Sequence, residues 1–216
     1  MTDIRVAIVD DQELVRMGLR MMLDAQPDIE VVAEASDGRE AVGLAAAGGI
    51  DVILMDVRMP GLDGIAATEQ IAARADAPRI LVLTTFDLDE YAFSALRAGA
   101  SGFLLKDARP PELLGAIRAV HSGDAALAPR VTARMIEQFV EAPAPADETR
   151  LEVLTPRERE ILIAIGEGMT NDELAAHFFL SISTVKTHIS RLLQKLDARD
   201  RVQLVILAYE AGLVGR

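Results

Sequence analysis

The sequence predicts an α/β protein in which a doubly wound sheet of five parallel strands is followed by an all-α domain of four helices. Over about 120 residues, short apolar runs of strand length alternate strictly with segments whose apolar residues recur at helical spacing. Short helical crossovers of this kind make the strands parallel and the connections right-handed. A (βα)5 pattern of this length is expected to order its strands 2-1-3-4-5.

The expected strands are apolar runs that end at polar residues or turn signals. The third run, Val52-Ile53-Leu54-Met55, contains no polar residue, which is typical of a central strand buried on both faces. It leads directly to Asp56, and Pro60-Gly61 marks a turn soon after it. The five runs are residues 4–9, 30–35, 52–55, 79–84 and 102–106.

A helix is expected after each strand. The first is indicated by apolar residues at helical spacing, namely Leu14, Met17, Gly18, Met21 and Met22. Glycine and proline then punctuate the pattern, as they do at helix ends. The later helices are expected after Gly38, at 64–71, at 89–97 and at 112–121.

A second domain is indicated by a change of pattern after residue 122. A helical stretch at 130–140 is followed by an Ala/Pro/acid run at 141–148, which has little to bury and is typical of a semi-extended linker. We therefore expect one domain at 1–122, a linker with a helical segment at 123–150, and a second domain at 151–216.

The second domain is predicted to hold four helices. Thr155-Pro156 favours a helix start, with threonine as N-cap and proline in the first helical position. Asn171 is expected to cap a second helix that ends at Phe178. After a short turn, a third helix at 183–196 carries an apolar stripe on one face and polar or basic residues on the other, and a final helix spans 202–209.

Composition limits the possible functions. The 216 residues suit two domains, and the absence of cysteine excludes disulfides and thiolate metal sites. The N-terminus has no basic region followed by an apolar run, and no apolar stretch approaches the roughly 18 residues of a membrane span. We therefore expect a soluble, cytoplasmic protein with no membrane partner.

The net charge of −12 is unevenly distributed. Residues 147–216 carry 9 Lys/Arg and 11 Asp/Glu, whereas the rest carry 13 and 23. Within 181–196 there are three cations and no acid. A local basic face can bind phosphates even on an acidic protein, so nucleic acid is not excluded as a partner.

Carboxylates are predicted to converge at one edge of the sheet. Asp10-Asp11 follow the first strand and Asp56 follows the third, and these strands are neighbours in the expected order. Three carboxylates supply the hard oxygen ligands that Mg²⁺ prefers, and one beside the metal is a plausible nucleophile for phosphoryl transfer. Thr84 and Lys106 end the fourth and fifth strands, where they could hold the phosphoryl oxygens.

Each of these residues alone is more often structural. An Asp at the end of a strand usually caps a loop or helix, a Thr is common in strands, a Lys is usually solvated, and an aromatic such as Phe103 is usually core. Their coincidence at the ends of four strands favours a shared site.

With these residues, 4–121 resemble the flavodoxin-like receiver domain of two-component response regulators. The resemblance implies an acidic pair at Asp10-Asp11, a phosphoacceptor, a switch hydroxyl, a switch aromatic and an invariant lysine, which here are Asp56, Thr84, Phe103 and Lys106. It also implies that Mg²⁺ takes oxygens of Asp11 and Asp56 and the backbone carbonyl of Arg58, with Asp10 acting through water. The switch aromatic is often Tyr, so Phe103 implies a packing change without a hydroxyl.

Residues 154–160 and 183–188 resemble the LuxR/NarL-type helix-turn-helix domain, and the whole chain resembles a NarL/FixJ-family regulator. The resemblance implies that base edges are read by Lys186, Thr187 and Ser190, and that Thr184, Arg191 and Lys195 contact phosphates. Ser190 is shorter than the residue that relatives often carry. The final helix implies a dimer contact through Val202, Val205, Ile206 and Tyr209, for which packing on the domain's own core is the plain alternative.

The expected function is a response regulator in which a sensor histidine kinase phosphorylates Asp56 and thereby controls dimerisation and binding of double-stranded promoter DNA. One alternative is a phosphatase or phosphotransferase, but position 58, where such enzymes place a second acid, is Arg. Another is a DNA-binding protein that does not respond to phosphorylation and whose first domain only mediates protein contacts.

Overall fold

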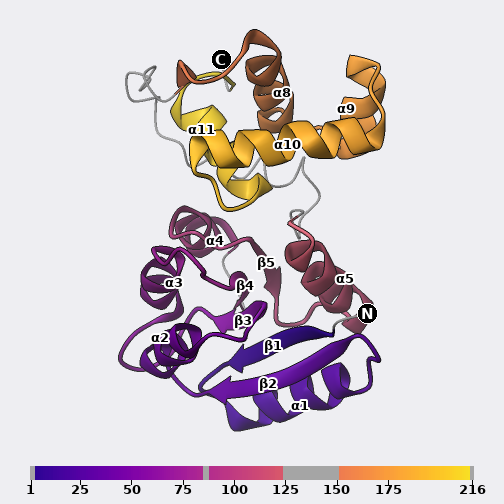
Figure 1. The fold of residues 1–216 in the computed structure, drawn as a ribbon. Coiled ribbons are helices and arrows are strands. Elements are labelled where there is room, and N and C mark those ends of the chain that lie inside the picture. Colours follow the sequence, from indigo (N-terminus) through magenta and orange to yellow (C-terminus); the bar gives the residue numbers. More distant parts are fainter. Residues whose placement is uncertain (1–2, 85–87, 124–150, 215–216) are drawn as a thin grey trace. The chain divides into compact units, whose positions relative to one another are not determined.

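A computed structural model describes residues 3–84, 88–123 and 151–214 of the chain (Figure 1). Two compact units are present: unit 1, Met1–Ala126, and unit 2, Leu127–Arg216. The helical stretch predicted at 130–140 and the linker predicted at 141–148 lie outside the described residues. In the described part of the chain, no helix combines the length and the apolar character that crossing a membrane requires.

Unit 1 contains a five-stranded sheet in which every pairing is parallel. Its strands are β1 (Ile4–Val9), β2 (Ile29–Ala35), β3 (Val52–Asp56), β4 (Arg79–Thr84) and β5 (Gly102–Leu105). The order β2-β1-β3-β4-β5 confirms the predicted topology. In the register Val9 lies opposite Met55, so the carboxyl ends of β1 and β3 finish side by side.

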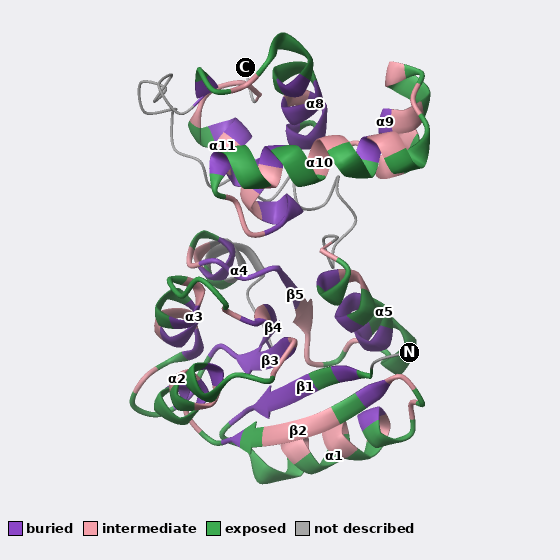
Figure 2. Ribbon diagram, in the orientation of Figure 1, coloured by how far each residue is buried: buried purple, intermediate pink, exposed green. Residues whose placement is uncertain are grey.

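Helices cover both faces of this sheet (Figure 1). The helix bounds are α1 (Glu13–Asp24), α2 (Gly38–Ala47), α3 (Gly64–Ala72), α4 (Leu88–Arg97) and α5 (Pro110–His121). One face packs on α1 and α5, and the other on α2, α3 and α4. The central strand β3 is buried along its whole length, as its uninterrupted apolar run predicted (Figure 2).

Only part of the apolar pattern of α1 belongs to the core. The helix packs through Leu23, with Leu19 and Met22 beside it. Leu14, Met17 and Met21 are instead 83%, 53% and 74% exposed. Helical spacing predicted the helix correctly, but it did not distinguish the face that packs on the sheet from the face that meets solvent.

Unit 2 contains four described helices, as predicted: α8 (Pro156–Gly166), α9 (Asn171–Phe178), α10 (Ile182–Leu196) and α11 (Arg201–Glu210). Its core is built from their apolar stripes, including Ile161, Leu162, Leu174, Val185 and Leu192. The hydroxyl oxygen of Thr155, the predicted N-cap, accepts a hydrogen bond from the backbone N–H of Glu158. The Glu158 carboxylate in turn accepts one from the backbone N–H of Thr155.

The predicted cap of α9 was wrong by one residue. Thr170 is the N-cap, and its hydroxyl oxygen accepts from the backbone N–H of Glu173. Asn171 is the first helical residue, and its side chain accepts a hydrogen bond from Arg201 at 2.8 Å. Thr170 stands three residues before Glu173 and forms a capping box with it, whereas the residue three positions after Asn171 is Leu174. The local sequence therefore contained the signal for the correct cap.

Candidate functional site

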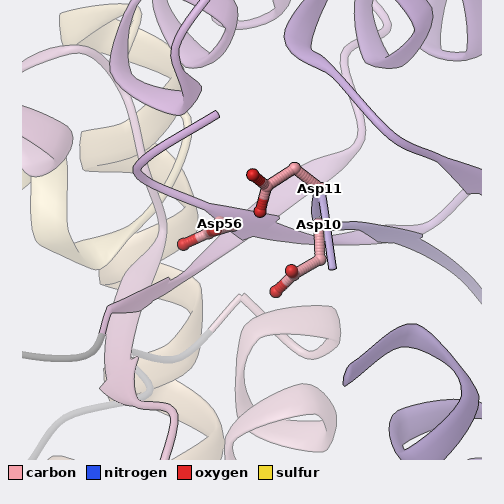
Figure 3. A group of neighbouring side chains, drawn as sticks. All are labelled: Asp10, Asp11 and Asp56. Atoms are coloured by element: carbon pink, nitrogen blue, oxygen red, sulfur yellow. The ribbon is translucent and has the colours of Figure 1, made fainter. Parts of the chain in front are cut away.

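The acidic cluster of Asp10, Asp11 and Asp56 lies at the carboxyl ends of β1 and β3 (Figure 3). One carboxylate oxygen from each residue lies within 4.8 Å of the others. Asp10 and Asp56 are buried, whereas Asp11 is exposed. The parallel register therefore brings together the three carboxylates that the sequence predicted would converge.

Lys106 is the cation of this cluster. Its Nζ lies 2.6 Å from Oδ2 of Asp10 and 2.9 Å from Oδ2 of Asp56. Its backbone N–H donates to the carbonyl oxygen of Thr84 at 2.7 Å, which ties the end of β5 to the end of β4. One lysine thus pairs with two of the three carboxylates, and the donor set of hard oxygens with surplus negative charge suits a divalent cation such as Mg²⁺.

The charges of the cluster are only partly compensated. Burial raises the pKa of Asp56, and the Asp10 carboxylate raises it further. The Lys106 ammonium and the backbone N–H of Arg58 act in the opposite direction, but the pKa of Asp56 stays above its ordinary value. Burial alone would lower the pKa of Lys106, yet its ion pairs with Asp10 and Asp56 raise it, so this lysine remains charged.

Two neighbours hold Asp10 in place, and the sequence did not indicate either. The backbone N–H of Gln12 donates to Oδ1 of Asp10 at 2.9 Å. The guanidinium of Arg16 donates to the backbone carbonyl of Asp10 at 2.7 Å. One face of Asp10 is therefore fixed by the start of α1, while its other oxygen faces Lys106.

Gly64 holds the backbone of Asp56. A Cβ at position 64 would lie 1.9 Å from the carbonyl oxygen of Asp56, so only glycine fits. The Gly64 N–H also donates to the carbonyl of Val57 at 2.9 Å. In the sequence Gly64 was only the first residue of a helix, and no local pattern distinguished it from a tolerant glycine.

The other predicted receiver residues also lie at this edge of the sheet or next to it. Thr84 is the last residue of β4 and is buried. Phe103, in β5, pairs with Val82 and is 3% exposed, so its ring already occupies the interior. The residues that directly follow Thr84, 85–87, lie outside the described residues.

In unit 2, α10 has one buried and one exposed face. Val185, Leu192 and Leu196 are buried. The residues predicted to read bases, Lys186, Thr187 and Ser190, are exposed, as is Arg191. The helix therefore presents a face without acidic residues to solvent, as a recognition helix requires.

Two of the predicted phosphate contacts have partners inside unit 2. The Nζ of Lys195 lies 2.7 Å from Oε2 of Glu158 and donates to the carbonyl of Val153 at 3.2 Å. The Thr184 hydroxyl lies 2.8 Å from that of Ser181. Their contact with DNA phosphates stays a prediction, and it would require these groups to share or exchange those partners.

The residues predicted to form a dimer contact are core residues. All four side chains, Val202, Val205, Ile206 and Tyr209, are at most 8% exposed, and α11 packs on α8 and α10. The plain alternative, packing on the domain's own core, thus describes this structure. Their contact with a second copy stays a prediction, and in this conformation α11 would present half-buried neighbours such as Gln203 and Leu207 instead.

Comparison with known proteins agrees with both halves of this geometry. The family model for the response regulator receiver domain matches residues 6–118. The model for bacterial regulatory proteins of the luxR family matches residues 152–208. Each match therefore falls on one of the two units.

Full-length relatives share this organisation. The chain is 46% identical over 213 residues to the transcriptional regulatory protein LiaR of Bacillus subtilis, covering 98% of this chain and 99% of LiaR. It is 38% identical to the response regulator protein VraR of Staphylococcus aureus, covering 98% of this chain and 99% of VraR. The crystal structure of the response regulator ChrA, from a heme-sensing two-component system, covers 99% of this chain and 100% of its own, at 41% identity and a TM-score of 0.54.

These matches span both units, include the acidic cluster and α10, and extend over nearly the whole length of each relative. The chain belongs to the response regulators that join a receiver domain to a LuxR-type DNA-binding domain.

Proposed function

We propose that this chain is a cytoplasmic transcription regulator in which a sensor histidine kinase phosphorylates Asp56, and that the phosphoryl group controls dimerisation and sequence-specific binding of promoter DNA. The observation that carries the proposal is the acidic cluster with Lys106 at 2.6 and 2.9 Å, in a chain that also exposes the acid-free face of α10.

The chemistry is a phosphoryl transfer to a carboxylate. An oxygen of Asp56 attacks the phosphorus, an O–P bond forms, and the P–N bond to the donor histidine breaks. Lys106 is placed to pair with a phosphoryl oxygen, because its Nζ already lies 2.9 Å from Asp56. The hydroxyl of Thr84 would approach the new group, and Phe103 would respond by packing.

Mg²⁺ would be held by Asp11 and Asp56 together with the backbone carbonyl of Arg58, and by Asp10 through water. When bound, it supplies positive charge to the phosphoryl oxygens. The close approach of the three carboxylates and their surplus negative charge support this assignment.

On the DNA side, Lys186, Thr187 and Ser190 would face base edges, while Thr184, Arg191 and Lys195 would contact phosphates. Phosphate contacts set the register and base contacts give sequence preference. A dimer would place two copies of α10 on paired half-sites. Phosphorylation would then act by shifting the population toward the dimer that binds DNA.

The test is a comparison of DNA binding with and without acetyl phosphate and Mg²⁺, for the wild type and Asp56→Asn. We expect the donor to increase the affinity of the wild type and to leave that of Asp56→Asn unchanged. Asp63→Asn is the matched control, because Asp63 caps α3 and asparagine caps equally well. Equal affinity with and without donor in the wild type would disprove the switch but not the DNA binding.

A further inference from the structure

Ile182 is an apolar side chain where a polar one would be expected. It opens α10 and is 39% exposed. It lies one helical turn before Lys186, so the two side chains share one face of the helix. From 181 to 196 the chain carries three cations and no acid, which favours a polyanion over a basic protein as the partner of this face.

The hydroxyl groups around Ile182 are turned toward the helix itself. The Ser181 hydroxyl, the N-cap, lies 2.8 Å from the hydroxyls of both Ser183 and Thr184. The Thr187 hydroxyl donates to the backbone carbonyl of Ser183 at 2.9 Å. The first turns of α10 therefore offer fewer outward hydrogen-bonding groups than the sequence suggests, and Ile182 presents an apolar surface among them.

We propose that Ile182 is a specificity-determining residue that contacts the C5-methyl group of a thymine in the major groove. This inference rests on the proposed function, because it requires α10 to enter the groove. Thymine is the base that presents an apolar group there, and apolar side chains distinguish it by contact with that methyl. The β-branched side chain is stiff, so Ile182 loses little conformational freedom when the groove covers it.

The experiment uses the full-length chain with acetyl phosphate and Mg²⁺. Duplexes are first selected from a random-sequence pool, and affinities are measured by fluorescence anisotropy. Each thymine of the selected duplex is then replaced in turn by uracil, which lacks only the methyl group. We expect uracil at one thymine of each half-site to weaken wild-type binding about fourfold, the loss typical of one buried methyl. For Ile182→Ala, the thymine and uracil duplexes should bind equally at that position.

Ile182→Ala should fold, because the side chain is partly exposed and alanine favours a helix. Val153→Ala is the matched control: Val153 is 53% exposed in the same unit but lies outside α10, so this variant should keep the full thymine-to-uracil ratio.

Two results would overturn the proposal separately from the proposed function. Either the selected duplex shows no thymine at which uracil weakens the wild type, or Ile182→Ala keeps the wild-type ratio at every thymine. A chain that enriches no sequence at all would overturn both this inference and the sequence-specific binding on which it rests.

Discussion

Each unit contains a lysine paired with a buried carboxylate, and the two pairs differ in how far their charges balance. In unit 1, Lys106 faces Asp10 and Asp56, with the third carboxylate of the acidic cluster close by. In unit 2, Lys195 faces Glu158 alone, and the backbone N–H and hydroxyl of Thr155 donate to the same carboxylate oxygen at 2.8 and 2.9 Å.

The carboxylates respond in opposite directions. Lys195 and then the Thr155 N–H lower the pKa of Glu158 from 4.5 to about 2. Burial, with Asp10 beside it, raises the pKa of Asp56 despite Lys106. Glu158 has a surplus of hydrogen-bond donors, so it is stabilised as an anion and supports the start of α8. Asp56 has too few donors, so it retains affinity for a further cation and is suited to chemistry.

The largest difference is expected when each lysine is replaced by methionine. Lys106→Met leaves buried carboxylates without a cation and should lower the stability of unit 1 by about 4 kcal/mol. Lys195→Met should cost unit 2 only about 1 kcal/mol, because that lysine is partly exposed and Thr155 still satisfies Glu158. Hydrogen exchange measured on peptides from each unit gives both values.

Millimolar Mg²⁺ should restore part of the stability of Lys106→Met and none of that of Lys195→Met. Equal losses in the two units, or a Mg²⁺ effect on both, would contradict the comparison.

Gly64→Ala tests the backbone that supports Asp56. The new Cβ would collide with the carbonyl oxygen of Asp56, so we expect a loss of about 2 kcal/mol in unit 1 and slower phosphorylation by acetyl phosphate. Gly43→Ala is the control, because Gly43 lies within α2 with no atom near its Cβ position and should gain about 0.5–1 kcal/mol. Urea unfolding and mass spectrometry of the phosphorylated chain supply the readouts, and wild-type behaviour of Gly64→Ala would refute the close contact.

The Glu158 pair predicts how unit 2 responds to acid. The pKa of Glu158 is lower in the folded state than its ordinary 4.5, so its contribution is fully present above pH 4.5 and is lost as the pH falls toward 2. After allowance for screening at Lys195, this contribution is about 2 kcal/mol.

In Glu158→Gln, the stability of unit 2 should therefore change less between pH 5 and pH 2.5 than it does in the wild type. The readout at each pH is the urea concentration at which half of unit 2 is unfolded, measured by hydrogen exchange of peptides from that unit. Glu160→Gln is the control, because Glu160 is exposed and its ion pair with Arg157 spans one turn of α8. Parallel stability curves for the wild type and Glu158→Gln would show that the pair does not determine the acid response.

The smallest expected effect concerns salt. On the selected duplex, the plot of log affinity against log salt concentration should be less steep for Arg191→Ala than for the wild type. The expected difference is the contribution of about one phosphate contact. Lys195→Ala should change the slope less, because Glu158 already neutralises that lysine. An equal change for the two variants would mean that Lys195 leaves Glu158 when DNA binds.

Much of the fold could be predicted from the chain alone, because the spacing of apolar residues within a short segment distinguishes a strand from a helix. The strands were located to within one residue, and the start of α10 differed by one because Ser181, rather than the turn after it, caps the helix. The convergence of Asp10, Asp11 and Asp56 was also predictable, because the carboxyl ends of neighbouring parallel strands share one edge.

Other features required the tertiary structure. The exposed side of α1, the burial of Val202, Val205, Ile206 and Tyr209, and the pairing of Lys195 with Glu158 depend on which surfaces meet across long sequence separations. An apolar stripe shows that a helix has a face but not what covers it, and a charge in a basic helix does not reveal a partner 37 residues away.

The sequence by itself determined the order of the elements and the chemistry available at the strand ends, because both follow from local residue types and the geometry of parallel sheets. Only the tertiary structure decided which charges are balanced. Lys106 is shared among carboxylates that outnumber it, and Lys195 is matched to one. Charge balance depends on distances of a few ångströms between distant segments, and packing sets those distances.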